Sequence, residues 1–152
     1  MSETCNSKWC RKRSRNDFKT NCSYACSCTR ATYDIPYKGN VSHLSAAEVA
    51  SAFIHSVSYD GDGAFVFDIF GESVNINETI KMIKEIKPNA KITSSGSEMP
   101  FPSKLSDIPL REHLKERIND YGSIDTKTMI SETIKAFEIL IQAGKIDNNY
   151  LK

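Results

Sequence analysis

Apolar residues recur at helical spacing in three stretches of the chain, and the first lies in its first half. Ser45-Ala-Ala-Glu48 forms a capping box, in which the serine hydroxyl and the glutamate carboxylate each bind a backbone amide at the helix start. The apolar positions that follow are spaced three and four residues apart: Ala46, Val49, Ala50, Phe53, Ile54 and Val57. The pattern predicts a helix over about 45–57.

Two further helices are predicted downstream. The second is capped by Asn75 or Asn77 and stops before Pro88, and its apolar stripe consists of Ile76, Ile80, Ile83 and Ile86. The third opens at Asp125 or Thr126. It carries its apolar face on Met129, Ile130, Ile134, Phe137, Leu140 and Ile141, and Gly144 is its predicted C-cap.

Between the helices, two segments read as strands. The run Ala64–Phe70 is apolar and β-prone, so it predicts a largely buried strand, and Lys91–Ser94 predicts a short one. Residues 96–109 contain three prolines and predict an ordered surface loop, followed by a short helix over Leu110–Ile118. Strands that alternate with helices predict an α/β fold.

Charge divides the chain into two parts. Residues 1–30 hold all five cysteines and seven Lys/Arg against two acids, whereas residues 31–152 hold thirteen Lys/Arg against seventeen acids. No apolar run approaches the ~20 residues of a membrane span, and no apolar leader is visible, so we expect a cytoplasmic protein without a membrane partner. A length of 152 residues allows one domain with a real core.

The cysteines leave two readings open. An odd number does not suit a disulfide framework, and the spacings of Cys5, Cys10, Cys22, Cys26 and Cys28 do not match the usual structural zinc sites. A zinc site nevertheless remains an alternative, as does docking of the basic run 8–15 on phosphates. We do not expect nucleic acid as a partner, because a positively charged tail explains the same run.

The rest of the chain shows no chemical motif. It contains no glycine-rich phosphate loop and no nucleophile paired with a base. His43, His55 and His113 are scattered, and the turn Asp60-Gly-Asp62-Gly63 lacks the remainder of a calcium loop. We therefore predict no catalytic residue and no metal ligand, and interpret this part as a substrate-side or structural module.

Several motifs resemble one enzyme family. They are the segment Tyr33-Asp-Ile-Pro-Tyr-Lys-Gly39, the helix start Ala47-Glu48-Val49-Ala50, the run 63–72, the proline-rich Met99–Pro102 and Glu132-Thr-Ile-x-x-Phe137. In this order they resemble the C-terminal part of extended short-chain dehydrogenases, in the NAD-dependent epimerase/dehydratase family, close to its D-erythronate dehydrogenase-like branch. The resemblance covers about three quarters of the chain, and Asp68 replaces the family's usual asparagine.

The resemblance implies an incomplete enzyme. Intact members move a hydride between NAD or NADP and a sugar, sugar acid or nucleotide sugar, and can form homodimers. Their "G-x-x-G-x-x-G" cofactor loop and "Y-x-x-x-K" catalytic pair are not in this sequence, so no cofactor and no catalysis are expected of this chain alone. The segment Tyr33, Ile35, Pro36 and Tyr37 matches the strand that passes the family's substrate pocket, and residues 96–109 are expected to line the same pocket.

The first 32 residues do not resemble the family as they stand. Codons for Arg11–Asn21 can be chosen so that reading one base later gives G-R-D-Q-G-M-T-S-K-P-T, as the family has before this point. Valine and alanine codons preceded by T read as cysteine one base earlier, which accounts for the cysteine cluster. We interpret residues 1–32 as a frameshifted segment that is disordered, not a folded domain, and residues 33–152 as the partial family region.

Overall fold

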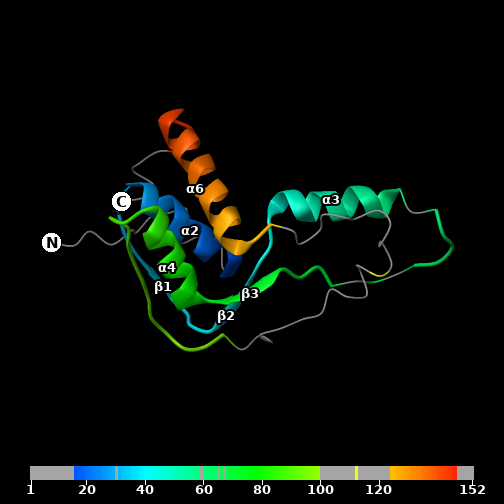
Figure 1. The fold of residues 1–152 in the computed structure, drawn as a ribbon, viewed down its shortest axis with the longest axis horizontal. Helices are drawn as coiled ribbons and strands as arrows, with labels where there is room; N and C mark the ends of the chain where they lie inside the picture. The colour runs from blue at the N-terminus through cyan, green and yellow to red at the C-terminus, as the bar shows by residue number, and fades with distance from the viewer. Residues whose placement is uncertain are drawn as a thin grey trace. The chain divides into compact units, whose positions relative to one another are not determined.

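The computed structural model describes residues 16–29, 31–58, 60–64, 66, 68–99, 112 and 124–146. The described residues form helices and two small sheets, in a mixed α/β arrangement (Figure 1). The chain divides into two compact units. Residues 1–15, and the predicted helix Leu110–Ile118 apart from Glu112, lie outside the described residues.

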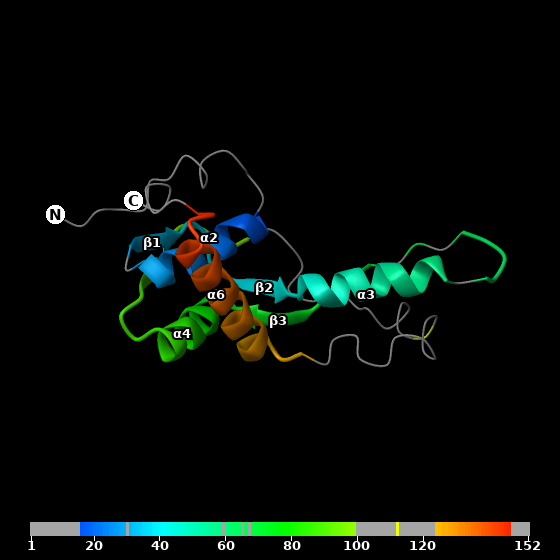
Figure 2. The same ribbon diagram turned by 90° about the horizontal axis from the view of Figure 1, so that it is seen from above.

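The first unit is built on a parallel pair of strands. Strand β1 (Thr32–Ile35) pairs with β4 (Lys91–Ser94) in the register Thr32↔Lys91 to Ile35↔Ser94. Parallel strands cannot be joined by a tight turn, so the chain must cross over between them. The crossover returns through helix α4 (Ile76–Ile86), and the first unit also contains helix α2 (Asn16–Thr29) and most of α6 (Thr126–Gln142). Figure 2 shows α2 beside β1.

The sheet of this unit is buried on one face only. Tyr33, Ile35 and Ile92 are 8%, 0% and 0% exposed, whereas the alternate residues Asp34 and Thr93 are exposed. This alternation follows from the two-residue period of a strand. Helix α2 contacts both strands and α4 contacts β4, so both helices share the core of the first unit with the sheet.

Helix α2 corrects the expectation that the first 30 residues are disordered. That expectation is wrong for Asn16–Thr29, which are helical. Six consecutive residues, from Cys22 to Ser27, are buried. Five of the six (Cys22, Ser23, Ala25, Cys26 and Ser27) have small side chains, which let a helix approach a sheet closely. Composition alone had suggested a basic tail, but six of the seven Lys/Arg of residues 1–30 precede the part that is buried.

Helices α4 and α6 confirm two predictions. Asn75 caps α4, its side chain accepting from the Asn77 amide at 3.0 Å, and the helix ends at Ile86 before Pro88. Ile76, Ile80 and Ile83 are buried, each contributing about 1.5–3 kcal/mol of hydrophobic free energy. Helix α6 opens at Thr126, and Gly144 follows its end at a φ of 64°.

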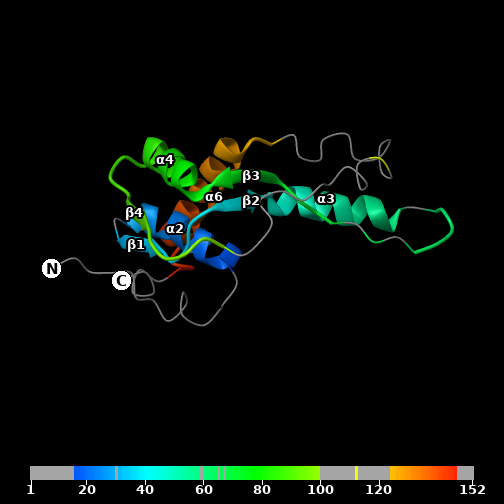
Figure 3. The same cartoon turned by 90° about the horizontal axis from the view of Figure 1, so that it is seen from below.

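The second unit pairs strands β2 (Asn40–His43) and β3 (Glu72–Asn75), drawn side by side in Figure 3. Helix α3 (Ala46–Val57) follows β2. The capping box is present as predicted: Ser45 Oγ accepts from the Glu48 amide at 3.0 Å, and Glu48 Oε2 accepts from the Ser45 amide at 3.3 Å. Sequence analysis had not predicted β2.

The predicted buried strand over residues 64–70 is wrong for residues 64, 66 and 68–70, whereas residues 65 and 67 lie outside the described residues. The described residues of that run are not in a strand, and Val66 is 96% exposed. The strand lies later, over Glu72–Asn75, because pairing with β2 fixes its position. Gly71 makes that approach possible: its amide donates to Ser42 Oγ at 2.9 Å, and a Cβ there would lie 1.8 Å from the His43 carbonyl oxygen. An apolar run without a partner strand does not make a sheet.

The fold is therefore α/β, with short strands and the helices as its larger elements. In the described part of the chain, no helix combines the length and the apolar character needed to cross a membrane.

Candidate functional site

The structure places the four predicted substrate residues on and just after strand β1. Tyr33, Ile35 and Tyr37 are buried at 8%, 0% and 4% exposure, so their side chains are part of the core. Pro36 is exposed. The structure thus brings three of them together on the buried face and sets Pro36 on the other side. Their contact with a substrate stays a prediction.

The exposed face of the same sheet carries a polar cluster that sequence analysis missed. Asp34 accepts hydrogen bonds through one carboxylate oxygen from Thr93 Oγ1, at 2.7 Å, and through the other from Ser95 Oγ. Asp34 lies opposite Thr93 in the strand register, which accounts for the first contact. The cluster presents a carboxylate and two hydroxyls to solvent, groups that can exchange hydrogen bonds with a polyhydroxylated ligand.

The position of Asp34 between two buried residues was the available signal. In the run Tyr33-Asp34-Ile35 an ionisable residue alternates with apolar ones, which predicts an exposed side chain on a half-buried strand. Nothing in the local sequence indicates Thr93 or Ser95 as its partners. Their contact depends on strand pairing across about sixty residues of chain.

The start of the predicted pocket loop is held close to the end of β1. Gly96 has a φ of 97°, and a Cβ on it would lie 2.6 Å from the Pro36 carbonyl oxygen, so this position requires glycine. Beyond it, the Lys38 amide donates to the Ser97 carbonyl at 3.1 Å, and the Met99 amide donates to the Lys38 carbonyl at 3.1 Å. Residues 96–99 therefore lie beside the segment that contains Pro36, which is consistent with the expectation that both line one pocket. Residues 100–109 lie outside the described residues.

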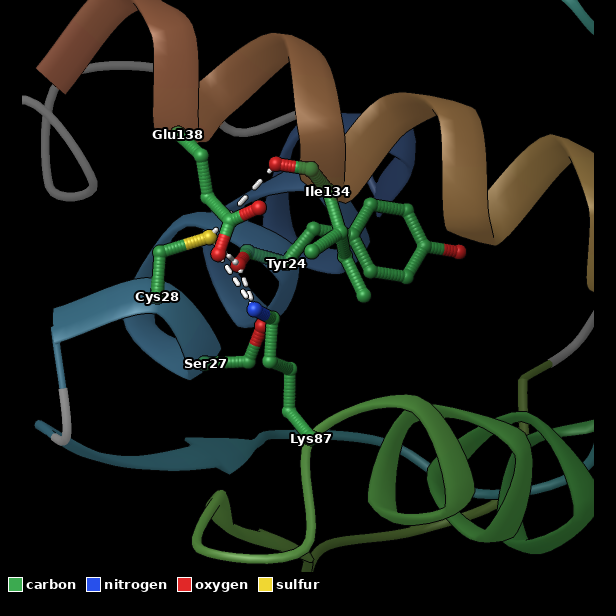
Figure 4. Close-up of polar contacts among 6 residues, drawn as sticks. All are labelled: Tyr24, Ser27, Cys28, Lys87, Ile134 and Glu138. Atoms are coloured by element: carbon green, nitrogen blue, oxygen red, sulfur yellow. Dashed lines mark hydrogen bonds and ion pairs between the residues drawn. The ribbon is translucent and has the colours of Figure 1, made fainter. Parts of the chain in front are cut away.

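A second polar cluster joins three helical segments of the first unit (Figure 4). Lys87, at the end of α4, forms an ion pair with Glu138 of α6. Beside them, Cys28 of α2 donates to the carbonyls of Tyr24, at 3.4 Å, and Ile134, at 3.7 Å. Burial is the main cause that raises the pKa of the Cys28 thiol, with Glu138 adding to it, while Ser27 and Lys87 act in the opposite direction. A thiol with a raised pKa is a weaker nucleophile at neutral pH. The contacts of this cluster join α2, the end of α4 and α6.

Polar groups in the second unit also serve its structure. Glu72 Oε2 accepts from the Thr126 amide at 3.2 Å and from Thr126 Oγ1 at 2.5 Å, so a carboxylate sits at the start of α6. Glu48 Oε1 accepts from the Ile124 amide at 3.4 Å. His43 is 8% exposed, and its burial lowers the pKa to about 4, with the nearby Glu72 opposing that shift. A neutral, buried imidazole of this kind is a structural group.

Each cysteine of α2 has a structural contact. Cys22 is disulfide-bonded, Cys26 is a thiol at 0% exposure, and Cys28 forms the helix contacts described above. Within the described ranges, no three of His, Cys, Asp and Glu gather closely enough to hold a metal ion. Cys5, Cys10 and His113 lie outside those ranges, and His55 lies on α3.

Comparison with known proteins adds no further constraint. No protein family, curated protein or solved structure matches the chain. We take the exposed face of the sheet β1–β4 as the candidate site. Its hydrogen-bonding groups belong to Asp34, Thr93 and Ser95, and Pro36 and Gly96 lie beside them.

Proposed function

We propose that this chain is a substrate-side portion of an NAD-dependent epimerase or dehydrogenase that acts on a sugar, sugar acid or nucleotide sugar, and that it does not transfer a hydride by itself. The family and the substrate class come from the resemblance of the sequence. The observation that carries the proposal further is the parallel pairing of β1 with β4 through helix α4. Parallel pairs with helical crossovers are the unit of α/β enzymes.

The expected pocket strand supports the proposal by its position. Strand β1 pairs with β4, and the residues that follow it, 36–38, lie beside residues 96–99. The exposed side of β1 carries Asp34, which accepts hydrogen bonds from two hydroxyl groups. Sugars are bound through arrays of carboxylate and hydroxyl groups that satisfy several hydroxyls at once. Hydride transfer, in contrast, requires a dinucleotide loop of the strand–glycine–helix type, and the sequence contains none.

The alternative, a zinc- or nucleic-acid-binding module at the cysteine-rich end, gains no support from the described residues. Cys22, Cys26 and Cys28 are used in a disulfide, in the core and in helix contacts. One equivalent of tightly bound zinc in the purified chain, measured by elemental analysis, would favour this alternative over the proposal.

Ligand titration of the purified chain tests the proposal. Two-dimensional amide NMR with D-erythronate is expected to shift resonances of Asp34, Thr93 and Ser95, and Asp34→Asn is expected to weaken that binding. Addition of NAD is expected to shift no resonance and to support no turnover. Binding of NAD, or sugar-acid shifts confined to other residues, would contradict the assignment.

The nucleotide sequence of the gene gives an independent test. The frame one base later is expected to read G-R-D-Q-G-M-T-S-K-P-T across Arg11–Asn21, and to continue upstream into a glycine-rich loop and a Y-x-x-x-K pair. Codons that give no such string would remove the frameshift interpretation, and the first 32 residues would then have to be explained as a native segment.

A further inference from the structure

The start of helix α6 is held by a carboxylate from strand β3. Glu72 Oε2 accepts hydrogen bonds from the Thr126 amide at 3.2 Å and from Thr126 Oγ1 at 2.5 Å. Thr126 is 3% exposed, so water offers little replacement for either bond. Glu72 as a whole is exposed, so its side chain can turn toward another partner without movement of the strand. The first turn of α6 therefore relies on a carboxylate that is able to change partner.

A histidine lies at the same end of the strand pair as this carboxylate (Figure 3). The Ile76 amide donates to the Gly39 carbonyl at 2.9 Å, so the residue after β3 meets the residue before β2. At the other end, a Cβ on Gly71 would lie 1.8 Å from the His43 carbonyl oxygen. The two strands therefore run antiparallel, and the last residue of β2, His43, lies beside the first residue of β3, Glu72.

The other carboxylates around this end have partners of their own. On α3, Glu48 is engaged in the capping box of its own helix. Just before α6, Asp125 accepts from the Thr128 amide at 3.0 Å and from its hydroxyl at 2.6 Å. Among the described residues, the charge that acts on the buried His43 ring is that of Glu72. His43 and Thr126 thus share one carboxylate as a neighbour.

We propose that His43 and Glu72 form an acid-sensitive latch on the start of α6. When the ring of His43 takes a proton from solvent, it gains a second N–H donor and a positive charge. A buried cation without a counter-ion is costly, so the imidazolium draws the Glu72 carboxylate away from Thr126. The Thr126 amide and hydroxyl then lose their acceptor, and the first turn of α6 opens. The inference does not rest on the proposed enzymatic family.

Amide hydrogen exchange of the full chain, measured by NMR from pH 7 to below pH 4, tests the latch. Burial lowers the pKa of His43 to about 4, so the Thr126 amide is expected to lose protection as the ring titrates in this range. The expected loss is about fivefold, the effect of losing a helix cap. The Asn77 amide is the internal control, because the Asn75 side chain that holds it does not titrate. Retained protection there distinguishes local opening from global acid unfolding.

Two variants separate the parts of the latch. Glu72→Gln keeps an acceptor for Thr126 and removes the charge that meets the imidazolium, so the protection factor of the Thr126 amide is expected to become independent of pH. His43→Gln is expected to have the same effect, whereas His55→Gln, the same change on α3, should leave the wild-type response intact. The proposal is overturned if His43→Gln still loses protection at Thr126, if the wild type keeps it while His43 titrates, or if Asn77 loses protection together with Thr126.

Discussion

Tyr24 of helix α2 provides the sharpest test of how this core is built. Its side chain is 3% exposed, and its phenolic oxygen has no hydrogen-bond partner among the described residues. Burial, and secondarily the neighbouring Tyr37, raise the pKa of the phenol. The ring contributes to the core, but its buried hydroxyl gains no hydrogen-bond partner from the described residues.

The magnitude follows from the cost of that hydroxyl. Leaving a buried donor unsatisfied costs about 1–3 kcal/mol. Tyr24→Phe keeps the ring and removes the oxygen, so we expect the free energy of unfolding to rise by about 1 kcal/mol. In a domain of this size that corresponds to an increase in Tm of about 2–4 °C.

Urea unfolding followed by circular dichroism measures the effect, with Thr79→Val as the control. Thr79 is also fully buried, but its hydroxyl donates to the Asn75 carbonyl at 3.4 Å. Removing a satisfied hydroxyl is expected to lower the free energy of unfolding by about 1 kcal/mol. The two variants should therefore change stability in opposite directions. If Tyr24→Phe destabilises the protein as much as Thr79→Val does, the phenol has a partner and the reasoning fails.

The pH dependence of Tyr24 gives a second readout. A phenol whose pKa is raised in the folded state holds its proton longer there than in the unfolded chain, so stability falls as the pH rises above about 10. Tyr24→Phe is expected to reduce that alkaline loss. An unchanged alkaline profile would mean that the phenol is not shielded from water.

Three further predictions concern the second unit and the pocket loop. Burial lowers the pKa of His43 to about 4 in the fold, against 6.5 in the unfolded chain, so the folded protein loses about 3 kcal/mol of stability as the pH falls from 6.5 towards 4. Urea unfolding midpoints measured between pH 7 and pH 4 should show this loss, and His43→Gln should make the pH profile flatter. Glu72→Ala removes the acceptor of the Thr126 amide and hydroxyl and is expected to cost about 1 kcal/mol by chemical denaturation, whereas equal stability would mean that the cap contributes nothing. Gly96→Ala combines a positive φ with a clash on the Pro36 carbonyl and is expected to cost more than about 1 kcal/mol, and a neutral outcome in the same assay would show that the loop start relaxes freely.

The candidate site was only partly predictable. Strand β1 was indicated by its residues and by the resemblance. The structure buries Tyr33, Ile35 and Tyr37, and their contact with a substrate stays a prediction. Asp34, on the opposite face, forms the exposed polar cluster with Thr93 and Ser95, which the sequence did not indicate. Which face of a strand meets solvent depends on the helices that cover the other face. The four residues of the strand do not specify those helices.

The sequence by itself determined the helices α3, α4 and α6. Their ends depend on neighbouring residues. The capping box at Ser45 and the cap at Asn75 satisfy backbone amides in the first turn, and Gly144 ends α6. Such contacts form over three or four residues, so a local pattern is enough to predict them.

The local sequence also predicted the strand Lys91–Ser94, which the structure confirms as β4. Only the tertiary structure decided how the strands pair, where β2 and β3 lie, and that α2 is a buried helix. The described residues of the run 64–70 are not in a strand despite their apolar composition, while β3 forms where Gly71 lets the backbone reach β2. Helix α2 is ordered by small residues that pack on β1 and β4, although its composition resembles a tail. These outcomes depend on residues distant in the chain, and their free energy comes from burial that no local window contains.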